Sequence, residues 1–446
     1  MAWKAVHGAA VALLILCAAS TAIAQACVNT VGRSTLPGNS SGLVVYPRNV
    51  FIQGCNNSVF GSDQIVIVGN NNIVADNKYD LSYAGQCGNR HTLPTLPDGT
   101  NLPCDVYIFI NQANGNELRG NKDVRCAYVG MFADKNRIML NDANYLTDSS
   151  SASGNDIERN ILNGGGGGTA NKPQIKLVYG ANGNRILDNK ADYIYLESSA
   201  SDNEVRMNDA AGGIELYDRA SKNVIVDNRL ERNNANWRYT GSIVVDYEAS
   251  GNSVIHNNVT ASNFQSSIFV EYHANDNHIS NNVAGSLTDS SSASNNTMEG
   301  NEVDYYLEIW GNHDSSSETA NNDTVISNVV GKYLYVGSNA DGDIVSFNNV
   351  TAGHLKVAND ANDNVIERCA LRYAYAAARS SNGGTARIAS QSIAAMAGAP
   401  GGAGAAAALT ASALPPLVDA LLAQAPLRGG ARALCVRRPA ATSVTC

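Results

Sequence analysis

Short runs of alternating apolar and polar residues recur along most of the chain. Two examples are Ile194-Tyr195-Leu196 and Leu334-Tyr335-Val336. A period of two with β-branched or aromatic residues is typical of β-strands, and these segments lack the 3.6-residue period of a helix. This part of the chain is therefore predicted to be all-β.

A second motif, Ala-x-x-Asn-x-(Ile/Val)-x-x-Asn, follows most of these runs. Asp323 and Asp343 replace the first Asn in two copies, and Cys369 replaces the closing Asn in one. The spacing is 19 to 29 residues, except for one gap of 44 after Asn72 that is expected to hide a further repeat. The first Asn or Asp of the thirteen copies stands at 72, 116, 136, 155, 184, 203, 223, 252, 277, 296, 323, 343 and 364.

A repeat of this length with two or three short strands predicts a coil that stacks on the next coil through parallel pairing. The aliphatic residues would point inward, and the Ala would lie inside a tight corner. Asn suits such a corner because its amide tolerates left-handed backbone angles and can hydrogen-bond from coil to coil. Asp148 and Asp289 fall at inward positions, which predicts a local bulge there.

With these features, residues 56–375 resemble the right-handed parallel β-helix repeat family with the pectin-lyase-like fold. The resemblance implies a single-stranded right-handed solenoid of about 13–15 coils. It also implies a family that includes polysaccharide lyases, glycoside hydrolases and non-catalytic adhesins, so it specifies a fold rather than an activity. The chain lacks the Asn-Thr-Asp, Gly-His-Gly, Arg-Ile-Lys and Arg-x-Pro-x-x-Arg segments of the known enzymes, and no catalytic residue carries over.

The ends of the chain differ from the repeats. Residues 1–24 have the features of a secretory signal peptide: Lys4, an apolar run, and the small-x-small site Ala22-Ile23-Ala24. Residues 25–55 are predicted to cap the first coil. Residues 376–446 form an Ala/Gly-rich tail in which a short helix after Pro416 is an alternative to a dangling end. We expect a secreted, extracellular protein without a membrane span.

An exported chain with an even number of cysteines after signal removal is expected to form disulfides. The preferred pairs are Cys87 with Cys104 and Cys435 with Cys446, while Cys27 with Cys55 is a further hypothesis. Six Asn-x-Ser/Thr sequons would make it a glycoprotein in a eukaryote. They begin at Asn39, Asn56, Asn258, Asn295, Asn322 and Asn349.

Composition narrows the choice of partners. The chain has 31 Lys and Arg against 40 Asp and Glu, a formal net charge of −9. A protein that neutralises phosphates needs a basic surface, so nucleic acid is disfavoured as a partner. Charged residues make up only 16% of the chain, which argues against a coiled coil.

Two outward columns of the predicted sheet carry aromatic and acidic side chains, eight and six residues before each first Asn, with more at the strand ends. Flat rings can stack on sugar faces and carboxylates accept hydroxyl hydrogen bonds, so this pattern is typical of a glycan-binding face. The predicted binding residues are Tyr195, Glu197, Glu215, Tyr217, Tyr247, Tyr272, Glu308 and Trp310.

Asp246 and Glu271 share one of these columns in adjacent repeats, so their backbones should be about 5 Å apart. Two carboxylates that close should share a proton or hold a cation such as calcium. No other cofactor is expected. His273 and Arg219 lie near the same strand ends and are candidate assisting groups. Together the four residues are the candidate catalytic set.

Four interpretations stay open. One interpretation is an ordinary solvated sheet surface, since Tyr, Glu and Lys are common there. The functional interpretation is a secreted β-helix protein that binds extracellular polysaccharide or cell-surface glycan. The alternatives are a polysaccharide lyase or glycoside hydrolase acting on the same face, and a structural wall or coat protein that serves as a spacer.

Overall fold

The computed structural model is all-β in the residues that it describes, which contain strands and no helix. The chain divides into two compact units, Met1–Asp192 and Tyr193–Cys446. The described residues are 44–45, 49–52, 58–60, 64–67, 70–75, 107–110, 113–130, 132–149, 152–162, 174–231, 241–260, 267–290, 292–311, 319–358, 361, 363–378, 387–388 and 432–435.

In the first unit, strands pair in two parallel sheets. Sheet 1 consists of short strands, which from β5 onward contain the apolar residue of the Asn motif: β1 (Val44–Val45), β3 (Ser58–Phe60), β5 (Ile73–Ala75), β7 (Glu117–Arg119), β9 (Arg137–Met139), β11 (Asp156–Glu158) and β14 (Arg185–Leu187). Sheet 2 contains the alternating runs: β2 (Asn49–Ile52), β4 (Gln64–Ile67), β6 (Tyr107–Ile110), β8 (Val124–Val129), β10 (Asp142–Ser149), β12 (Ile161–Leu162) and β13 (Gln174–Val178). β15 (Lys190–Leu196) contains the boundary between the units.

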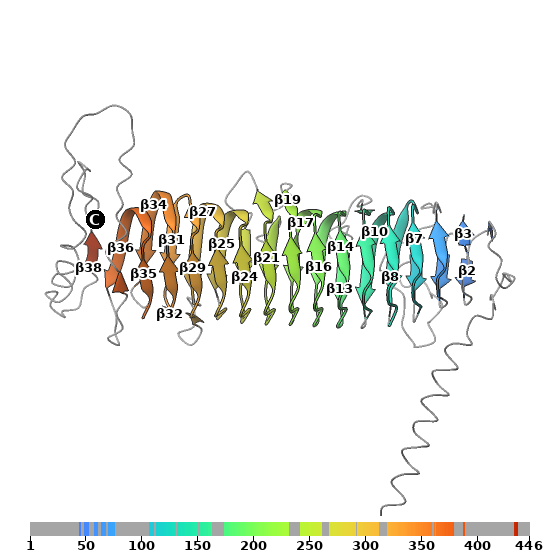
Figure 1. Cartoon of the computed structure of the whole chain (residues 1–446), viewed down its shortest axis with the longest axis horizontal. Helices are drawn as coiled ribbons and strands as arrows, with labels where there is room; N and C mark the ends of the chain where they lie inside the picture. The colour runs from blue at the N-terminus through green and yellow to red at the C-terminus, as the bar shows by residue number, and fades with distance from the viewer. Residues whose placement is uncertain are drawn as a thin grey trace, which may run out of the picture. The chain divides into compact units, whose positions relative to one another are not determined.

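The second unit repeats this arrangement (Figure 1). Its sheet 1 consists of β16 (Glu204–Arg206), β18 (Val224–Val226), β21 (Ser253–Ile255), β24 (His278–Ser280), β26 (Thr297–Glu299), β29 (Thr324–Ile326), β33 (Ile344–Ser346), β35 (Val365–Glu367) and β37 (Arg387–Ile388). Its sheet 2 consists of β17 (Asp209–Leu216), β19 (Arg229–Glu231), β20 (Ser242–Val245), β22 (Asn258–Thr260), β23 (Ser267–Val270), β25 (Val283–Ser290), β27 (Glu302–Trp310), β30 (Val329–Val330), β31 (Tyr333–Val336), β34 (Asn349–Val357) and β36 (Ala370–Ala378). β28 (Ala320–Asn321) pairs with β32 (Ala340–Asp341), and β38 (Arg432–Cys435) is antiparallel to β36.

The predicted parallel β structure is thus confirmed, and repeated parallel pairing of sequence-adjacent repeats is consistent with a β-solenoid. One expectation about the repeats is wrong. β5 pairs directly with β7, and the N–H of Asn72 donates to Oδ1 of Asn116 at 2.8 Å. The gap of 44 residues therefore holds an insertion between adjacent strands of sheet 1 rather than a hidden copy of the motif.

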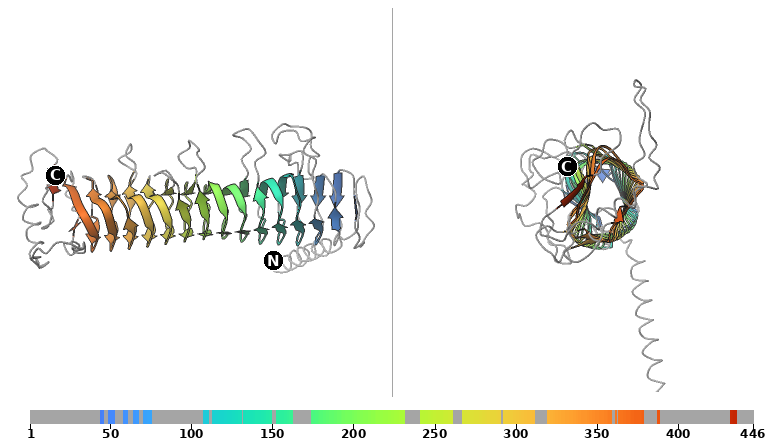
Figure 2. Two further views of the ribbon diagram at one scale, coloured as in Figure 1. Left: turned by 90° about the horizontal axis from the view of Figure 1, so that it is seen from above. Right: turned by 90° about the vertical axis from the view of Figure 1, so that its left-hand side faces the viewer.

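The predicted core is confirmed in the described residues. The apolar residue of each Asn motif is at most 1% exposed, from Val74 to Ile366. The alternating runs bury their inward members, such as Ile243 and Val245, and the corner alanines are likewise buried. Seen end-on, the strands surround this interior (Figure 2). Burial of these stacked aliphatic columns is the main stabilising term of each unit.

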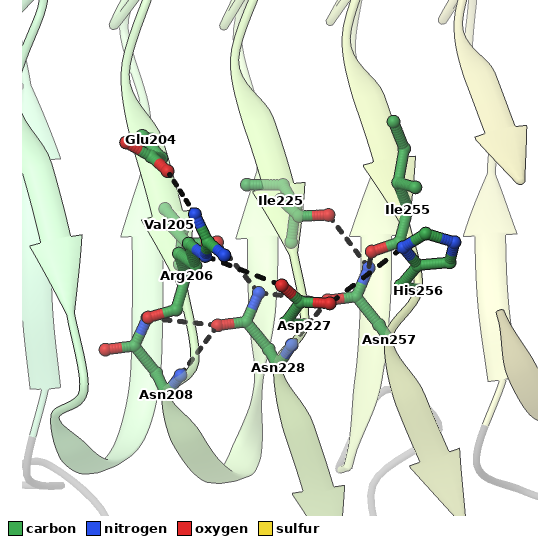
Figure 3. Close-up of polar contacts among 10 residues, drawn as sticks. All are labelled: Glu204, Val205, Arg206, Asn208, Ile225, Asp227, Asn228, Ile255, His256 and Asn257. Carbon is green, nitrogen blue, oxygen red and sulfur yellow. Dashed lines mark hydrogen bonds and ion pairs between the residues drawn. The ribbon is translucent and has the colours of Figure 1, made fainter. Parts of the chain in front are cut away.

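The motif asparagines form two ladders that continue from repeat to repeat. In Figure 3, the N–H and Nδ2 of Asn208 both donate to Oδ1 of Asn228, at 2.9 and 3.0 Å. Asn228 donates in the same way to Asn257, and its Nδ2 also donates to the carbonyl of Val205. All polar atoms of such a side chain are therefore paired inside the protein, which removes the cost of burying an amide.

The left-handed backbone lies one residue before each ladder asparagine, which corrects the sequence interpretation. Lys222 has φ 55° and Asp227 has φ 56°, whereas Asn223 and Asn228 are not in this region. The asparagines are used for their inward hydrogen bonds, and the tight turn is made by the outward residue that precedes them. That position accepts many residue types because its side chain points to solvent.

Asp289 does not cause a bulge. It stays in register between Val270 and Ile309 and is completely buried. The irregularity in this region lies opposite residues 284–286, where β27 has one extra residue relative to β25. Asp148 is also in register, since it pairs with Val129 and Leu177.

The signal peptide (1–24) and most of the cap (25–55) and tail (376–446) lie outside the described residues. The described part of the predicted cap consists of β1 and β2, which pair in parallel with β3 and β4 like the strands of the other repeats. Cys27, Cys55, Cys87, Cys104 and Cys446 also lie outside the described residues, while the side chain of Cys435 is not described. The predicted disulfides thus stay predictions. Among the described residues, Cys369 is a buried free thiol. It ends the second ladder, with Nδ2 of Asn348 at 4.0 Å from its sulfur.

Candidate functional site

The predicted columns share a register in sheet 2 of the second unit, but their middle members, such as Val244, Phe269 and Thr288, are at most 8% exposed. The column eight residues before the motif, here called column I, is in continuous register. Its members are Glu215, Val244, Phe269, Thr288, Glu308, Tyr335 and Lys356. Column II contains Glu197, Tyr217, Asp246, Glu271 and Ser290, each six residues before the motif, and also Trp310, which an insertion separates from its motif. Backbone hydrogen bonds connect its first four repeats, and Ser290 pairs with Trp310.

Three tyrosines at this face contact one another across adjacent strands. The ring centroids of Tyr217 and Tyr247 are 4.6 Å apart, and those of Tyr247 and Tyr272 are 5.3 Å apart with an interplanar angle of 18°. Tyr247 is 48% exposed and Tyr272 is 40% exposed. The rings of Tyr247 and Tyr272 are stacked, whereas the ring of Tyr217 is tilted by 54° against that of Tyr247. We call this group the tyrosine stack.

Within the tyrosine stack, the pKa of Tyr217 is raised. Burial is the largest cause of the raised pKa of Tyr217, followed by the proximity of Tyr247 and of the carboxylates of Asp246, Asp218 and Glu215. The Tyr217 hydroxyl therefore stays protonated over a wider range than a free phenol. It remains a hydrogen-bond donor at neutral and mildly alkaline pH.

Asp246 and Glu271 are neighbours, as predicted, but they are buried. The N–H of Asp246 donates to Leu216 and that of Glu271 donates to Val245, both at 2.9 Å, which places the two residues in consecutive positions of column II. Asp246 is 6% exposed and Glu271 is 1% exposed. Oδ1 of Asp246 accepts the N–H of Tyr247 at 2.7 Å. The expectation that both lie on a solvated surface is therefore wrong, and Asp246 anchors the corner that carries Tyr247.

Arg219 and His273 lie at corners just beyond the strands. Each is the second of two consecutive residues with positive φ, after Asp218 and Tyr272 respectively. Both are exposed, and Nε of Arg219 is 3.2 Å from Oδ1 of Asp218. An exposed ion pair of this kind contributes little to stability. The structure thus places these two residues at the edge of the tyrosine stack, past the buried carboxylates.

The C-terminal part of the face has a different composition. Lys356 Nζ lies 4.8 Å from the ring centroid of Tyr335, and burial raises the pKa of the Glu308 carboxyl while Lys356 lowers it. A Cβ at Gly337 would lie 2.4 Å from Cβ of Trp310, so glycine is required beside this half-buried ring. Glu308 in column I and Trp310 in column II both belong to β27.

The sequence analysis missed a further group on these strands. Nζ of Lys332 lies 4.4 Å from the ring centroid of Tyr305, and the rings of Tyr333 and His354 are 4.7 Å apart. Burial lowers the pKa of His354, and Lys356 lowers it further. Tyr333 and His354 occupy one register position ten residues before the motif, outside the two columns that the sequence pattern singled out.

A charged row on sheet 1 lies outside the tyrosine stack (Figure 3). Arg206 is 3.8 Å from Glu204 and 3.4 Å from Asp227, and His256 is 3.9 Å from Asp227. These side chains are substantially exposed, and such pairs follow from the stacking of like positions in adjacent repeats. They are a solvated surface feature rather than a site.

Within the described part of the chain, no group of three or more His, Cys, Asp or Glu side chains is arranged to hold a metal ion. The described residues also contain no helix long and apolar enough to cross a membrane. Comparisons of the chain with protein-family models, curated proteins and solved structures found no match.

Proposed function

We propose that the chain is a secreted right-handed parallel β-helix protein that binds extracellular polysaccharide at sheet 2 of the second unit. The fold proposal is supported by the parallel register and the two asparagine ladders. The observation that carries the binding proposal is the tyrosine stack, in which three rings follow one another across adjacent strands. A repeating row of contacts suits a repeating polymer.

The contacts would differ from those expected from the sequence. The faces of Tyr247 and Tyr272 cover each other, so sugar rings would meet ring edges and phenol hydroxyls. Exposed corner groups such as Arg219, Glu248 and His273 supply hydrogen-bond partners beside them. A polymer of hydroxyl-rich sugars matches this mixture of apolar edges with donors and acceptors.

The test is binding of the full chain to a panel of polysaccharides, measured by retardation in gels that contain each polymer. We expect Tyr247→Ala with Tyr272→Ala to weaken binding at least tenfold, which is about 1.4 kcal/mol. Phe347→Ala is the matched control because Phe347 is exposed to a similar degree, 49%, at a corner of sheet 1. Equal loss in both variants, or no retardation by any polymer, would refute the proposal.

The same panel examines the enzymatic alternative, which is favoured by the adjacency of Asp246 and Glu271. Appearance of new reducing or unsaturated ends that is lost in Asp246→Asn, with the fold retained, would support a hydrolase or lyase. Their burial supports binding over catalysis, because a general acid must reach the substrate. Self-association without glycan binding would instead support the structural spacer.

A further inference from the structure

The first asparagine ladder of the second unit is interrupted by acids. In a regular step, the side-chain amide donates to the next ladder oxygen and to the alanine carbonyl of the preceding repeat, as Asn252 does to Asn277 and Ala220. Asp323 and Asp343 occupy ladder positions and are completely buried. An ionised carboxylate has no donor, so it cannot make either of these bonds.

One oxygen of each acid takes the place of the amide oxygen. Oδ1 of Asp323 accepts the N–H of Asn296 at 2.8 Å, and Oδ1 of Asp343 accepts the N–H of Asp323 at 2.9 Å. The other oxygen, Oδ2, is buried in both residues and has no hydrogen-bond partner among the described residues. It replaces the amide nitrogen, which in this ladder donates to an alanine carbonyl, as in Asn364 to Ala340.

A third buried acid adjoins the interruption. Asp289 points into the core between Val270 and Ile309, and its Oδ2 accepts Nδ2 of Asn296 at 3.0 Å. Its Oδ1 has no donor among the described residues when the acids are ionised. The carboxyl groups of Asp289 and Asp323 interact directly, and a hydrogen bond between them requires a proton on one of the two. Asn296 thus turns its amide toward Asp289, whereas the equivalent amide of other repeats donates to the next ladder residue.

Among the described residues, no positive charge acts on this group. The charged groups that act on it are the three acids themselves and Asp341, and no described Lys, Arg or His forms an ion pair with any of the three. Burial raises the pKa of Asp289 and of Asp323 well above the ordinary range, and each is raised further by a neighbouring acid. Burial raises the pKa of Asp343 to about 7.

We propose that Asp289, Asp323 and Asp343 form a proton-locked segment of the core, in which carboxylic acid protons replace the missing amide donors and alkaline pH opens the segment. A proton on Oδ2 makes each acid a donor of the same kind as an asparagine amide. Its removal leaves adjacent buried anions that face carbonyl oxygens. The segment around 319–346 would then separate from its neighbours while the other repeats stay paired.

The sign of the pH dependence follows from proton counting. An unfolded aspartate has a pKa of about 3.9, so above pH 4 the unfolded chain holds fewer protons at these positions than the folded chain. Stability from these groups is therefore complete below that value. It falls as pH rises through about 7 for Asp343, and the raised pKa values of Asp289 and Asp323 give a decrease of the same sign.

The experiment compares the full chain with Asp323→Asn/Asp343→Asn, which restores the regular ladder, and with Asp227→Asn, which removes an exposed carboxylate. We measure thermal midpoints and hydrogen exchange of peptides from 319–346 between pH 5 and 9, with exchange corrected for its intrinsic pH dependence. The wild type should lose midpoint and protection as pH rises. The double variant should lose less and exceed the wild type at pH 9 by roughly 5 °C, while Asp227→Asn follows the wild type.

Parallel pH profiles for wild type and double variant would overturn the proposal. Should the double variant not fold, the wild type still decides the question through its infrared spectrum. Buried protonated carboxyl groups at pH 7 give a carbonyl band distinct from that of carboxylates, and its absence would refute the proton lock.

Discussion

At the scale of single residues, the ladder asparagines have the strongest requirement for one side chain. Asn228 uses its Oδ1 twice as an acceptor and its Nδ2 twice as a donor, all within the protein. No other side chain offers an acceptor and two donors at this length. Aspartate keeps the acceptor and loses the donors, and Cys369 keeps only weak sulfur contacts at 3.3 to 4.0 Å.

Replacement of a ladder asparagine should therefore cost more than a surface change. Asn228→Ala removes the acceptor of the Asn208 N–H and one acceptor of its Nδ2, and it removes the donor to the Val205 carbonyl, at about 1–3 kcal/mol for each buried group left unpaired. Urea unfolding should show a loss of about 3 kcal/mol. Asn258→Ala, an exposed asparagine on β22, is the control and should change stability by less than about 0.5 kcal/mol. Equal losses would contradict the role of the ladder.

At the scale of the element, each corner combines an inward asparagine with an outward residue in the left-handed region. This geometry recurs before both ladders, at residues as different as Met207, Lys222 and His256. The strain of a left-handed residue is about 1–2 kcal/mol, so it must be outweighed by the strand pairing and ladder bonds on both sides. The corner is set by the repeat rather than by the residue that occupies it.

Substitution at one corner can measure that strain. Lys222→Gly should raise the free energy of unfolding by about 0.5 kcal/mol, because relief of the left-handed angle exceeds the entropy cost of glycine. Lys222→Val should lower it by about 1 kcal/mol or more, since β-branched residues avoid this region. Ser221→Gly, next to it and outside the left-handed region, should be destabilising. Chemical denaturation of the three variants checks this order, and a destabilising Lys222→Gly would disprove it.

At the scale of the whole molecule, the negative net charge affects which polymers can approach the protein. The chain carries a net charge of −9, and Glu197, Glu215 and Glu248 lie around the tyrosine stack. A polyanionic polymer would approach against this field, whereas a neutral or amino-sugar polymer would not. We therefore expect the proposed site to bind uronate-rich or sulfated glycans less tightly than neutral ones.

This selectivity should depend on ionic strength. At low salt, neutral or amino-sugar polymers should bind more tightly than a polyuronate of similar length, and the difference should shrink near 0.5 M salt because exposed charges are then screened. Gel retardation at two salt concentrations measures it. The tyrosine double variant serves as control for non-specific attraction. Stronger binding of the polyuronate in the absence of calcium would contradict the prediction.

The periodicity of the sequence determined the parallel strands, the inward aliphatic columns, the ladder positions and the register of columns I and II. It could do so because each repeat places the same residue types at the same places, and stacking turns chain spacing into contact. Tertiary structure alone decided that Asp246 and Glu271 are buried, that the tyrosine rings cover each other, and that the left-handed residue precedes the asparagine. Alternation tells on which side of a strand a side chain leaves the backbone, but what covers it and how its ring turns depend on neighbouring strands that lie far away in the sequence.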